Sequence, residues 1–306
     1  MDIKLTIYIV VILLSSIDVP RALANEINGG SCEIRHPSPQ SELDRRHEYP
    51  LALLAHFLAI TEEEFGPCEL VEMGALSQKR EIAWLKDNEL DVSWLPATTA
   101  LNDSLLYVPV PIRKGLLGWR VLLIHKDNVD AFKNVNSLAD LQAFNAGFGA
   151  AWGDLPVMQH NLETVTTSAG YESLFEMLDY KRFDFLSRSF SEAFDEVYAR
   201  AEQQPNIVIE PRIALRYPEA HFFYFSNQSG HIKKRIEEGF KKSIQEGSFN
   251  IIFYGYYGEY IDKVRMFDRL ILDLDNPFIP SNVPLDDPEL WFKLDVYEEY
   301  LRQNKR

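Results

Sequence analysis

Residues 137–154, SLADLQAFNAGFGAAWGD, decide the fold class of this 306-residue chain. Ser137 is a preferred helix N-cap residue and opens a short apolar helix. A glycine-containing apolar strand follows at 145–150, and the turn at 152–154 precedes a predicted helix at 155–161. Alternation of helix and short apolar strand is typical of an α/β layer with a parallel sheet.

The alternation continues towards the C-terminus. The pattern predicts a helix at 170–178, the strand RFDFLS at 182–187, a helix at 191–202 and a strand at 207–213. These elements and the opening stretch form one predicted α/β unit.

A first α/β unit precedes it. The predicted strands lie at 31–35, 68–72 and 91–95, with helices at 49–60 and 76–88. Longer apolar strands are expected at 105–111 and 119–125. After the second unit come an aromatic strand at 221–226 and an amphipathic helix at 230–246, ending at Gly247.

The order of these segments resembles the type II periplasmic solute-binding proteins, in particular their amino-acid-binding, family 3-like branch. The stretches that carry the resemblance are 137–154, ESLFEMLDYKRFDFLSRSFSEA (172–193), KDNELDVSWLP (86–96) and LRYPEAHFFYFS (215–226). It covers roughly residues 31–265. The resemblance implies two α/β lobes, joined by two crossover strands, that close around a small molecule.

The expected domains follow from this likeness and from the ends of the chain. Lobe one is predicted at 25–120 and 222–275, and lobe two at 121–221. The Pro- and aromatic-rich tail, 276–306, is expected to pack on the surface, with a docking surface as the alternative. Residues 1–24 resemble a signal peptide, because the apolar run LTIYIVVILL is too short to span a bilayer and Ala22-Leu23-Ala24 is a small-x-small cleavage site.

Composition excludes several classes of protein. With 31 Lys and Arg against 46 Asp and Glu, the formal charge is −15, which disfavours nucleic-acid binding. The only cysteines, Cys32 and Cys68, each begin a predicted strand; in an oxidising periplasm they form either one disulfide or two separate buried thiols. No metal-ligand spacing and no nucleophile motif are present, so we expect no metal, cofactor or catalytic residue.

Ligands of open α/β sheets lie beyond the carboxyl ends of the strands. The candidate ligand-binding residues, each at a strand end or crossover of the resemblance, are Arg35, Trp94, Trp119, Arg120, Trp152, Gly153, Ser187, Arg188 and Ser189. Four of them have a structural alternative: Arg35 in a solvent-facing loop, Trp94 as core, Arg120 in an ion pair with the acid-rich surface, and Arg188 held by Glu192. Asp154 is interpreted as a helix cap.

Two departures from the amino-acid-binding pattern bear on the ligand. Asn102 stands where the family holds the ligand carboxylate with an arginine, and Ser187-Arg188-Ser189 occupies the region of the aspartate that holds the amine. The hypothesis is therefore a small polar or anionic ligand. We predict a monomeric periplasmic solute-binding protein for an ABC importer; a module reporting to a membrane sensor and, less favoured, a dehydratase-like enzyme are the alternatives.

Overall fold

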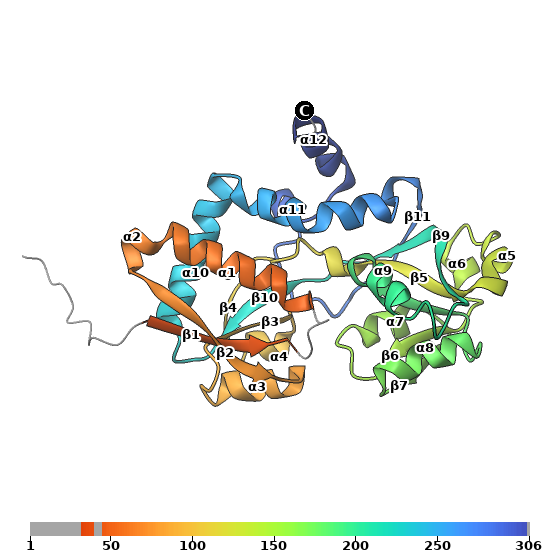
Figure 1. The fold of residues 1–306 in the computed structure, drawn as a ribbon, viewed down its shortest axis with the longest axis horizontal. Helices are drawn as coiled ribbons and strands as arrows, with labels where there is room; N and C mark the ends of the chain where they lie inside the picture. The colour runs from red at the N-terminus through yellow and green to blue at the C-terminus, as the bar shows by residue number, and fades with distance from the viewer. Residues whose placement is uncertain (1–31, 40–44, 305–306) are drawn as a thin grey trace, which may run out of the picture.

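A computed structural model describes residues 32–39 and 45–304 of the chain. Two α/β lobes lie side by side, with helix α11 running across both of them (Figure 1). The expected signal peptide lies outside the described residues.

The strands of lobe one occupy neighbouring positions in space. They are β1 (Cys32–Ser38), β2 (Cys68–Ala75), β3 (Val92–Pro96), β4 (Leu106–Val108) and β10 (His221–Phe225). β1 pairs with β2 in parallel, and β10 pairs antiparallel with both β3 and β4. The backbone N–H of Asp91 donates to the carbonyl of Arg35 at 2.9 Å, so β1 lies beside β3. The spatial order is therefore β2-β1-β3-β10-β4.

Lobe two contains one six-stranded sheet in the order β11-β9-β5-β8-β6-β7. Its strands are β5 (Trp119–His125), β6 (Ala146–Gly149), β7 (Val165–Ser168), β8 (Phe185–Ser189), β9 (Ile207–Arg216) and β11 (Leu270–Asp273). β5 is antiparallel to both β8 and β9, and every residue of β5 is buried.

The two lobes repeat one topology. In each, parallel strands in the order second, first, third are followed by one antiparallel strand that arrives from the other lobe: β10 in lobe one and β5 in lobe two. In this arrangement the carboxyl ends of the first and third strands border the crevice where ligands bind in open α/β sheets.

The helices cover these sheets. The longer ones are α1 (Glu48–Ile60), α3 (Gln78–Lys86), α7 (Leu155–Asn161), α8 (Tyr171–Asp179), α9 (Phe190–Ala199), α10 (Gly230–Gln245), α11 (Ser248–Lys263) and α12 (Leu294–Asn304). Single turns of helix are α2 (Glu62–Phe65), α4 (Thr99–Asn102), α5 (Val129–Phe132) and α6 (Leu138–Leu141), besides 3-10 turns such as η1 (Arg45–His47) and η2 (Leu116–Gly118). Ser137 caps α6 as expected, because its Oγ accepts from the N–H of Asp140.

The two crossover segments touch at Gly118 and Tyr217. The N–H of Tyr217 donates to the carbonyl of Gly118 at 3.1 Å. A Cβ atom at position 118 would lie 2.1 Å from the Tyr217 carbonyl oxygen, so this crossing requires glycine.

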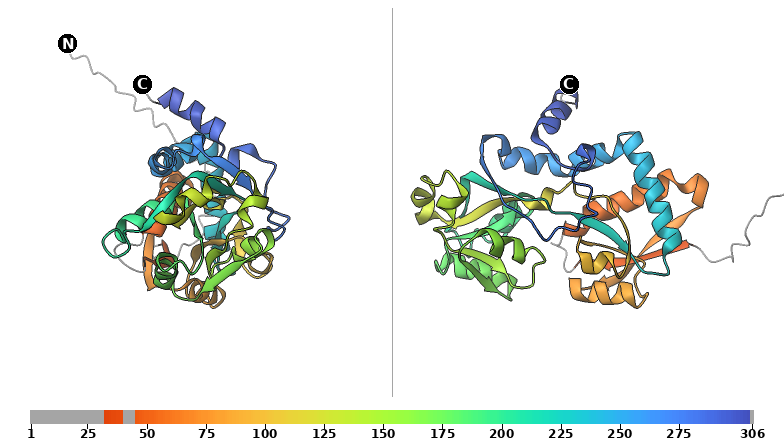
Figure 2. Two further views of the ribbon diagram at one scale, coloured as in Figure 1. Left: turned by 90° about the vertical axis from the view of Figure 1, so that its right-hand side faces the viewer. Right: turned by 180° about the vertical axis from the view of Figure 1, so that it is seen from behind.

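α11 and the tail connect the lobes a second time (Figure 2). Phe253 of α11 packs on Tyr49 of α1, while the hydroxyl of Tyr260 donates to Asp195 of α9 at 3.1 Å. β11 then pairs with β9, although the sequence placed residues 222–275 in lobe one. The tail returns to lobe one, where the N–H of Phe292 donates to the carbonyl of Lys114. One apolar cluster therefore includes residues of both lobes, such as Leu53 and Phe175.

The sequence predicted most elements to within a few residues, and α7 at its observed bounds. α11, β11 and α12 were not predicted. Cys32 and Cys68 pair at the first position of β1 and β2 and form the disulfide, which settles the open alternative.

Candidate functional site

The carboxyl ends of strands from the two lobes meet at Pro96 and Gly153. Pro96 ends β3, and Gly153 follows β6 by a short turn. A Cβ atom built at Gly153 would lie 3.6 Å from Cγ of Pro96, so the two lobes approach each other closely here. This approach marks the candidate site.

On the lobe-one side, Trp94 of β3 is 7% exposed. Its ring lies 5.1 Å edge-on from His47 and 6.3 Å from His36, and it also meets Phe223 of β10. Trp94 therefore belongs to the lobe-one core and lies beside the two histidines that end β1 and precede α1.

Arg35, in the middle of β1, forms an internal ion pair. Its Nε lies 2.9 Å from Oδ2 of Asp91, and its Nη2 donates to the carbonyl of Asn88. Burial opposes ionisation of Asp91, but hydrogen bonds from Arg35 hold the pKa of that carboxyl below its usual value. Arg35 thus joins β1 to β3, and its guanidinium is engaged within lobe one.

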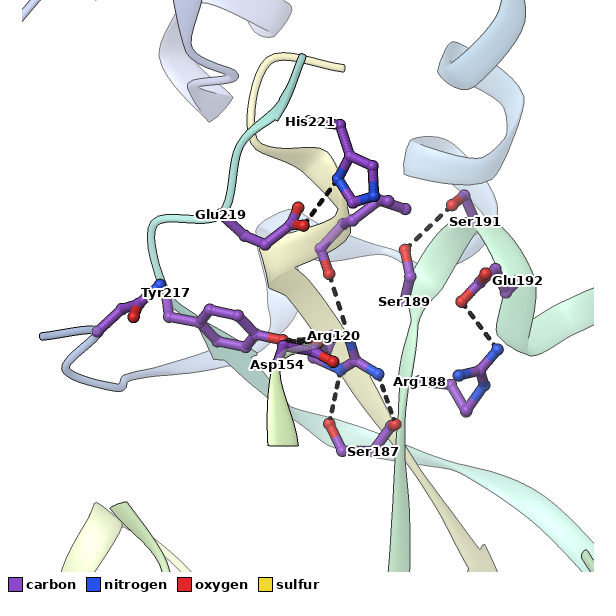
Figure 3. Close-up of polar contacts among 12 residues, drawn as sticks. Arg120, Asp154, Ser187, Arg188, Ser189, Ser191, Glu192, Tyr217, Glu219 and His221 are labelled. Atoms are coloured by element: carbon purple, nitrogen blue, oxygen red, sulfur yellow. Dashed lines mark hydrogen bonds and ion pairs between the residues drawn. The ribbon is translucent and has the colours of Figure 1, made fainter. Parts of the chain in front are cut away.

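Arg120 lies in the network drawn in Figure 3. Its Nε donates to Oγ of Ser187 at 2.9 Å, its Nη2 to the carbonyl of Ser187 at 2.8 Å, and its Nη1 to Oδ2 of Asp154 at 2.9 Å and to the hydroxyl of Tyr217 at 3.1 Å. Burial lowers the pKa of Arg120, but the charges of Tyr217 and Asp154 raise it by more. The pKa of Arg120 therefore lies above the ordinary value of arginine. The internal ion pair is therefore the role that the structure gives Arg120. Asp154 stands at the N-cap position of α7, but its side chain binds Arg120 rather than capping.

Arg188 is also neutralised from within lobe two (Figure 3). Its Nη2 lies 2.6 Å from Oε1 of Glu196 and 2.9 Å from Oε2 of Glu192. Burial disfavours its charge, yet Glu192 and Glu196 keep the pKa of Arg188 above the ordinary value. The ring of Trp152 covers the guanidinium at 4.4 Å. The alternative that Glu192 holds Arg188 is what the structure shows.

The remaining candidate residues of the sequence, Trp119, Trp152, Gly153 and Ser189, have different surroundings. Gly153 is exposed, and Trp152 is half-buried between Phe148 and Arg188. Ser189 shares a hydrogen bond with Ser191 at the start of α9. Trp119 lies behind the crossover, between Phe292 and Arg216, and lines a shallow depression of about 380 Å³ with the tail. The structure therefore brings Trp152 and Arg188 together and places Gly153 near Pro96 of lobe one, whereas Trp119 lies apart beside the tail.

The sequence offered Arg113 only as a weaker candidate than Arg120 for binding a carboxylate or phosphate, and it did not predict α11, which lies beside Arg113. Tyr257 of α11 is buried, and burial raises its pKa, while the charge of Arg113 and a hydrogen bond with it oppose the rise. The charge of Glu192 in lobe two also raises the pKa of Tyr257, whose helix α11 contacts both lobes. The apolar, glycine-containing sequence of α11 shows no single polar face, which is why its helical pattern was not recognised.

Over the described ranges, no helix is long and apolar enough to cross a membrane. In the same parts of the chain, no group of three or more His, Cys, Asp or Glu side chains is placed to hold a metal ion.

Comparison with known proteins finds likeness in structure alone. No family model matches the sequence, and no curated protein does. An ancestral arginine-binding protein bound to arginine superposes with a TM-score of 0.52 at 12% identity, over 74% of this chain and 98% of that one. A structure from work on glutathione import by GshT and the cystine importer TcyBC of Streptococcus mutans gives 0.54 at 12% identity, over 75% and 96%. A histidine kinase sensor domain with similarity to periplasmic binding proteins gives 0.51 at 11% identity, over 74% and 96%.

The doubled strand order and these superpositions define the class of fold. The chain has the two-lobed fold of type II periplasmic solute-binding proteins, as in their amino-acid-binding branch. The fold positions a potential binding site between the lobes, and the chemistry of that site comes from residues particular to this chain.

Proposed function

We propose that this protein is a periplasmic solute-binding protein that captures a small polar or anionic molecule between its lobes. The observation that carries the proposal is the close approach of Gly153 to Pro96, because it brings together the strand ends at which ligands bind in this type of sheet. Two tryptophans belong to the adjoining strands and turns: Trp94 of β3 is buried beside His47, and Trp152 covers Arg188.

Binding fits the side chains better than catalysis does. A dehydratase-like enzyme needs a carboxylate as acid or base, and two carboxylates near the lobe boundary, Glu192 and Asp154, are each paired with a buried arginine. Both carboxylates are therefore engaged by contacts within the protein. One comparison structure is an ancestral amino-acid-binding protein described as a precursor of cyclohexadienyl dehydratase. A dehydratase is therefore the enzymatic alternative to the binding function.

The Cys32–Cys68 disulfide supports a periplasmic location, since disulfides persist in oxidising compartments. The signal peptide proposed for residues 1–24 would direct export. We propose a monomer that delivers its ligand to an ABC importer. The likeness to a histidine kinase sensor domain favours a membrane sensor as the second candidate partner.

A thermal-shift screen of the mature chain, from Asn25 onwards, against central metabolites tests the function. A ligand at about a hundred times its Kd stabilises the folded state by about 2.7 kcal/mol, so binding raises the unfolding temperature in a saturable way. We expect Trp94→Leu to abolish the shift and Trp84→Leu, on the outer helix α3, to keep it. A panel in which no compound shifts the wild type, or conversion of a bound compound to product, would overturn the proposal.

A further inference from the structure

Residues 275–282 lead into the tail and run from lobe two to lobe one (Figure 2). We call this segment the strap. Its sequence, DNPFIPSN, contains Pro277 and Pro280. Each proline fixes its own φ and restricts the residue before it, so the strap is stiff. Seven steps along an extended chain reach no more than about 25 Å, so the strap is also short.

Asn161, the last residue of α7, holds the strap on lobe two. Its Nδ2 donates to the carbonyl of Asp275 at 2.7 Å, and its Oδ1 accepts from the N–H of Asp275 at 2.9 Å. Asn161 is 7% exposed, and its Nδ2 also donates to the carbonyl of Val157 within α7. The ring of Phe278 lies edge-on 6.1 Å from His160. One buried amide therefore binds both backbone groups of a strap residue, which fixes this end to lobe two.

Asn282 holds the other end on lobe one. Its Oδ1 accepts from Nδ2 of Asn102 at 3.0 Å, and its Nδ2 donates to the hydroxyl of Tyr107. Ile279 and Val283 pack on an apolar cluster made of lobe-one residues, and Val283 is 5% exposed. The chain therefore passes from contacts with lobe two to contacts with lobe one between residues 278 and 279.

The tail also contacts both crossovers beside the point where they touch each other. Nδ2 of Asn276, in the strap, donates to the carbonyl of Pro218 at 2.7 Å, one residue after Tyr217. Farther along the tail, the N–H of Phe292 donates to the carbonyl of Lys114 in the first crossover at 2.7 Å. Hinge motions are absorbed by a few residues of such connecting segments. A change of the angle between the lobes therefore moves backbone groups to which the tail is bound.

We propose that the strap restrains the hinge and keeps the lobes at the close approach seen between Pro96 and Gly153. A contact that exists in one arrangement of the lobes stabilises that arrangement against every other in which the contact is lost. Because the strap is short, stiff and held at both ends, the lobes separate widely only when one end is released. Holding the lobes close in advance also lowers the cost of closing them around a ligand.

Lengthening the strap tests the restraint without deleting a side chain. Gly-Ser-Gly is inserted between residues 278 and 279, where the chain passes between the lobes, and adds a reach of about 10 Å. The control is the same insertion between residues 285 and 286, which are exposed. The anchors on both sides of the control position, Asn282 and Trp291, pack with lobe-one residues, so its length does not affect the lobes.

The readout is the distance between the lobes in the ligand-free protein. Spin labels are attached through Lys79→Cys on α3 and Tyr180→Cys at the end of α8, both exposed, and their separation is measured by double electron–electron resonance. We expect the strap insertion to broaden the distance distribution towards longer separations. The control insertion should reproduce the distribution of the labelled protein without an insertion.

Side-chain variants give a second measurement, which decides the matter if the strap insertion does not fold. Asn276→Ala combined with Asn282→Ala removes one contact at each end and should broaden the distribution in the same direction. Gln303→Ala, which removes an exposed amide bonded to Glu299 on α12, should not.

Identical distributions with and without the strap insertion would overturn the proposal. Equal broadening by both insertions would also overturn it, because the tail would then act through its general stability rather than through its length between the lobes. No ligand is present in these measurements, so the result is independent of the proposed function, which the thermal-shift screen tests separately.

Discussion

Arg188 and Glu196 form an ion pair buried in lobe two, with Nη2 of the arginine 2.6 Å from Oε1 of the glutamate. Nε of Arg188 also donates to Oε2 of Glu196 at 2.8 Å, and the hydroxyl of Tyr171 donates to Oε1. The two residues lie on β8 and α9, so the pair fastens a strand end to the helix that follows it. Its partners leave Arg188 little freedom to bind a ligand.

Arg188→Met should therefore act on stability. Removing one member of a buried pair leaves the other charge unpaired, which costs about 3–5 kcal/mol. We expect urea unfolding to show a loss of that order for Arg188→Met and for Glu196→Gln. Arg216→Met is the control, because the Arg216–Asp273 pair is exposed and such pairs contribute about 1 kcal/mol or less. A loss for Arg188→Met as small as that of the control would contradict the structure.

The same pair predicts a response to acid. Burial raises the pKa of Glu196, but the charge of Arg188 and hydrogen bonds from Arg188 and Tyr171 lower it below the ordinary value. A carboxyl whose pKa is depressed in the folded state contributes stability above its unfolded pKa, and that contribution is lost as pH falls through the folded value. The wild type should lose more stability than Glu196→Gln as pH falls below about 4.3, the ordinary pKa of glutamate. Parallel curves of unfolding free energy against pH would refute this.

Much of the fold was predictable because its signals are local. Ser137 caps a helix through its own side chain, and the apolar runs of β5 and β8 are long enough to indicate buried strands. α11 was not predictable in this way. It packs on α1 through Phe253 and reaches α9 through Tyr260, and its exposed face mixes polar residues with Ile251 and glycine, so its sequence gives no clear helical period.

The candidate site was less predictable than the fold. The sequence marked Arg120 and Arg188 by their place at a crossover and a strand end, and both places are confirmed. Their partners Asp154, Tyr217 and Glu196 come from other elements, and no local pattern tells which carboxylate a guanidinium will meet. Among the described residues Arg113 forms no ion pair and donates to the carbonyl of Arg46 instead, which only the three-dimensional arrangement shows.

The disulfide predicts a loss of stability on reduction. Cys32 and Cys68 are 36 residues apart and join the edge strand β2 to β1 at their first residues. Closing a loop of this length contributes about 3–4 kcal/mol in the chain-entropy model. We expect Cys32→Ser with Cys68→Ser, or reduction of the wild type, to lower the free energy of unfolding by that order. The double variant should be unaffected by reductant; equal stability of reduced and oxidised wild type would contradict the prediction.

Lys114 predicts a rise of stability in mild alkali. Its Nζ donates to the carbonyl of Glu289 in the tail and lies 4.5 Å above the ring of Phe249. Burial lowers the pKa of Lys114 to about 8. Since the unfolded chain then binds more protons than the folded one between pH 8 and the ordinary lysine pKa of about 10.4, stability should increase as pH rises through this window.

The control for this prediction is Lys114→Met, which lacks the titrating group but keeps the tyrosines that also ionise in alkali. The free energy of unfolding of the wild type, minus that of the variant, should rise by about 3 kcal/mol across the window, since one pKa unit corresponds to about 1.36 kcal/mol. A difference that stays constant with pH would show that Lys114 is not buried as a cation.

Trp291 and Gly115 predict a coupling between the tail and the first crossover. Gly115 has a φ of +71°, and a Cβ atom there would lie 2.5 Å from the Trp291 ring. Gly115→Ala should therefore combine backbone strain of about 1–2 kcal/mol with an overlap that costs about 1–3 kcal/mol. Gly247→Ala is the matched control, because Gly247 is also left-handed, with a φ of +78°, and has nothing near the added atom, so only the strain applies. In a double-mutant cycle, Trp291→Ala should relieve the overlap at Gly115→Ala but leave the cost of Gly247→Ala unchanged. If the losses of unfolding free energy for Gly115→Ala and Trp291→Ala were additive, the tail would not cover the first crossover in solution. The tail would then be free to move when the lobes move.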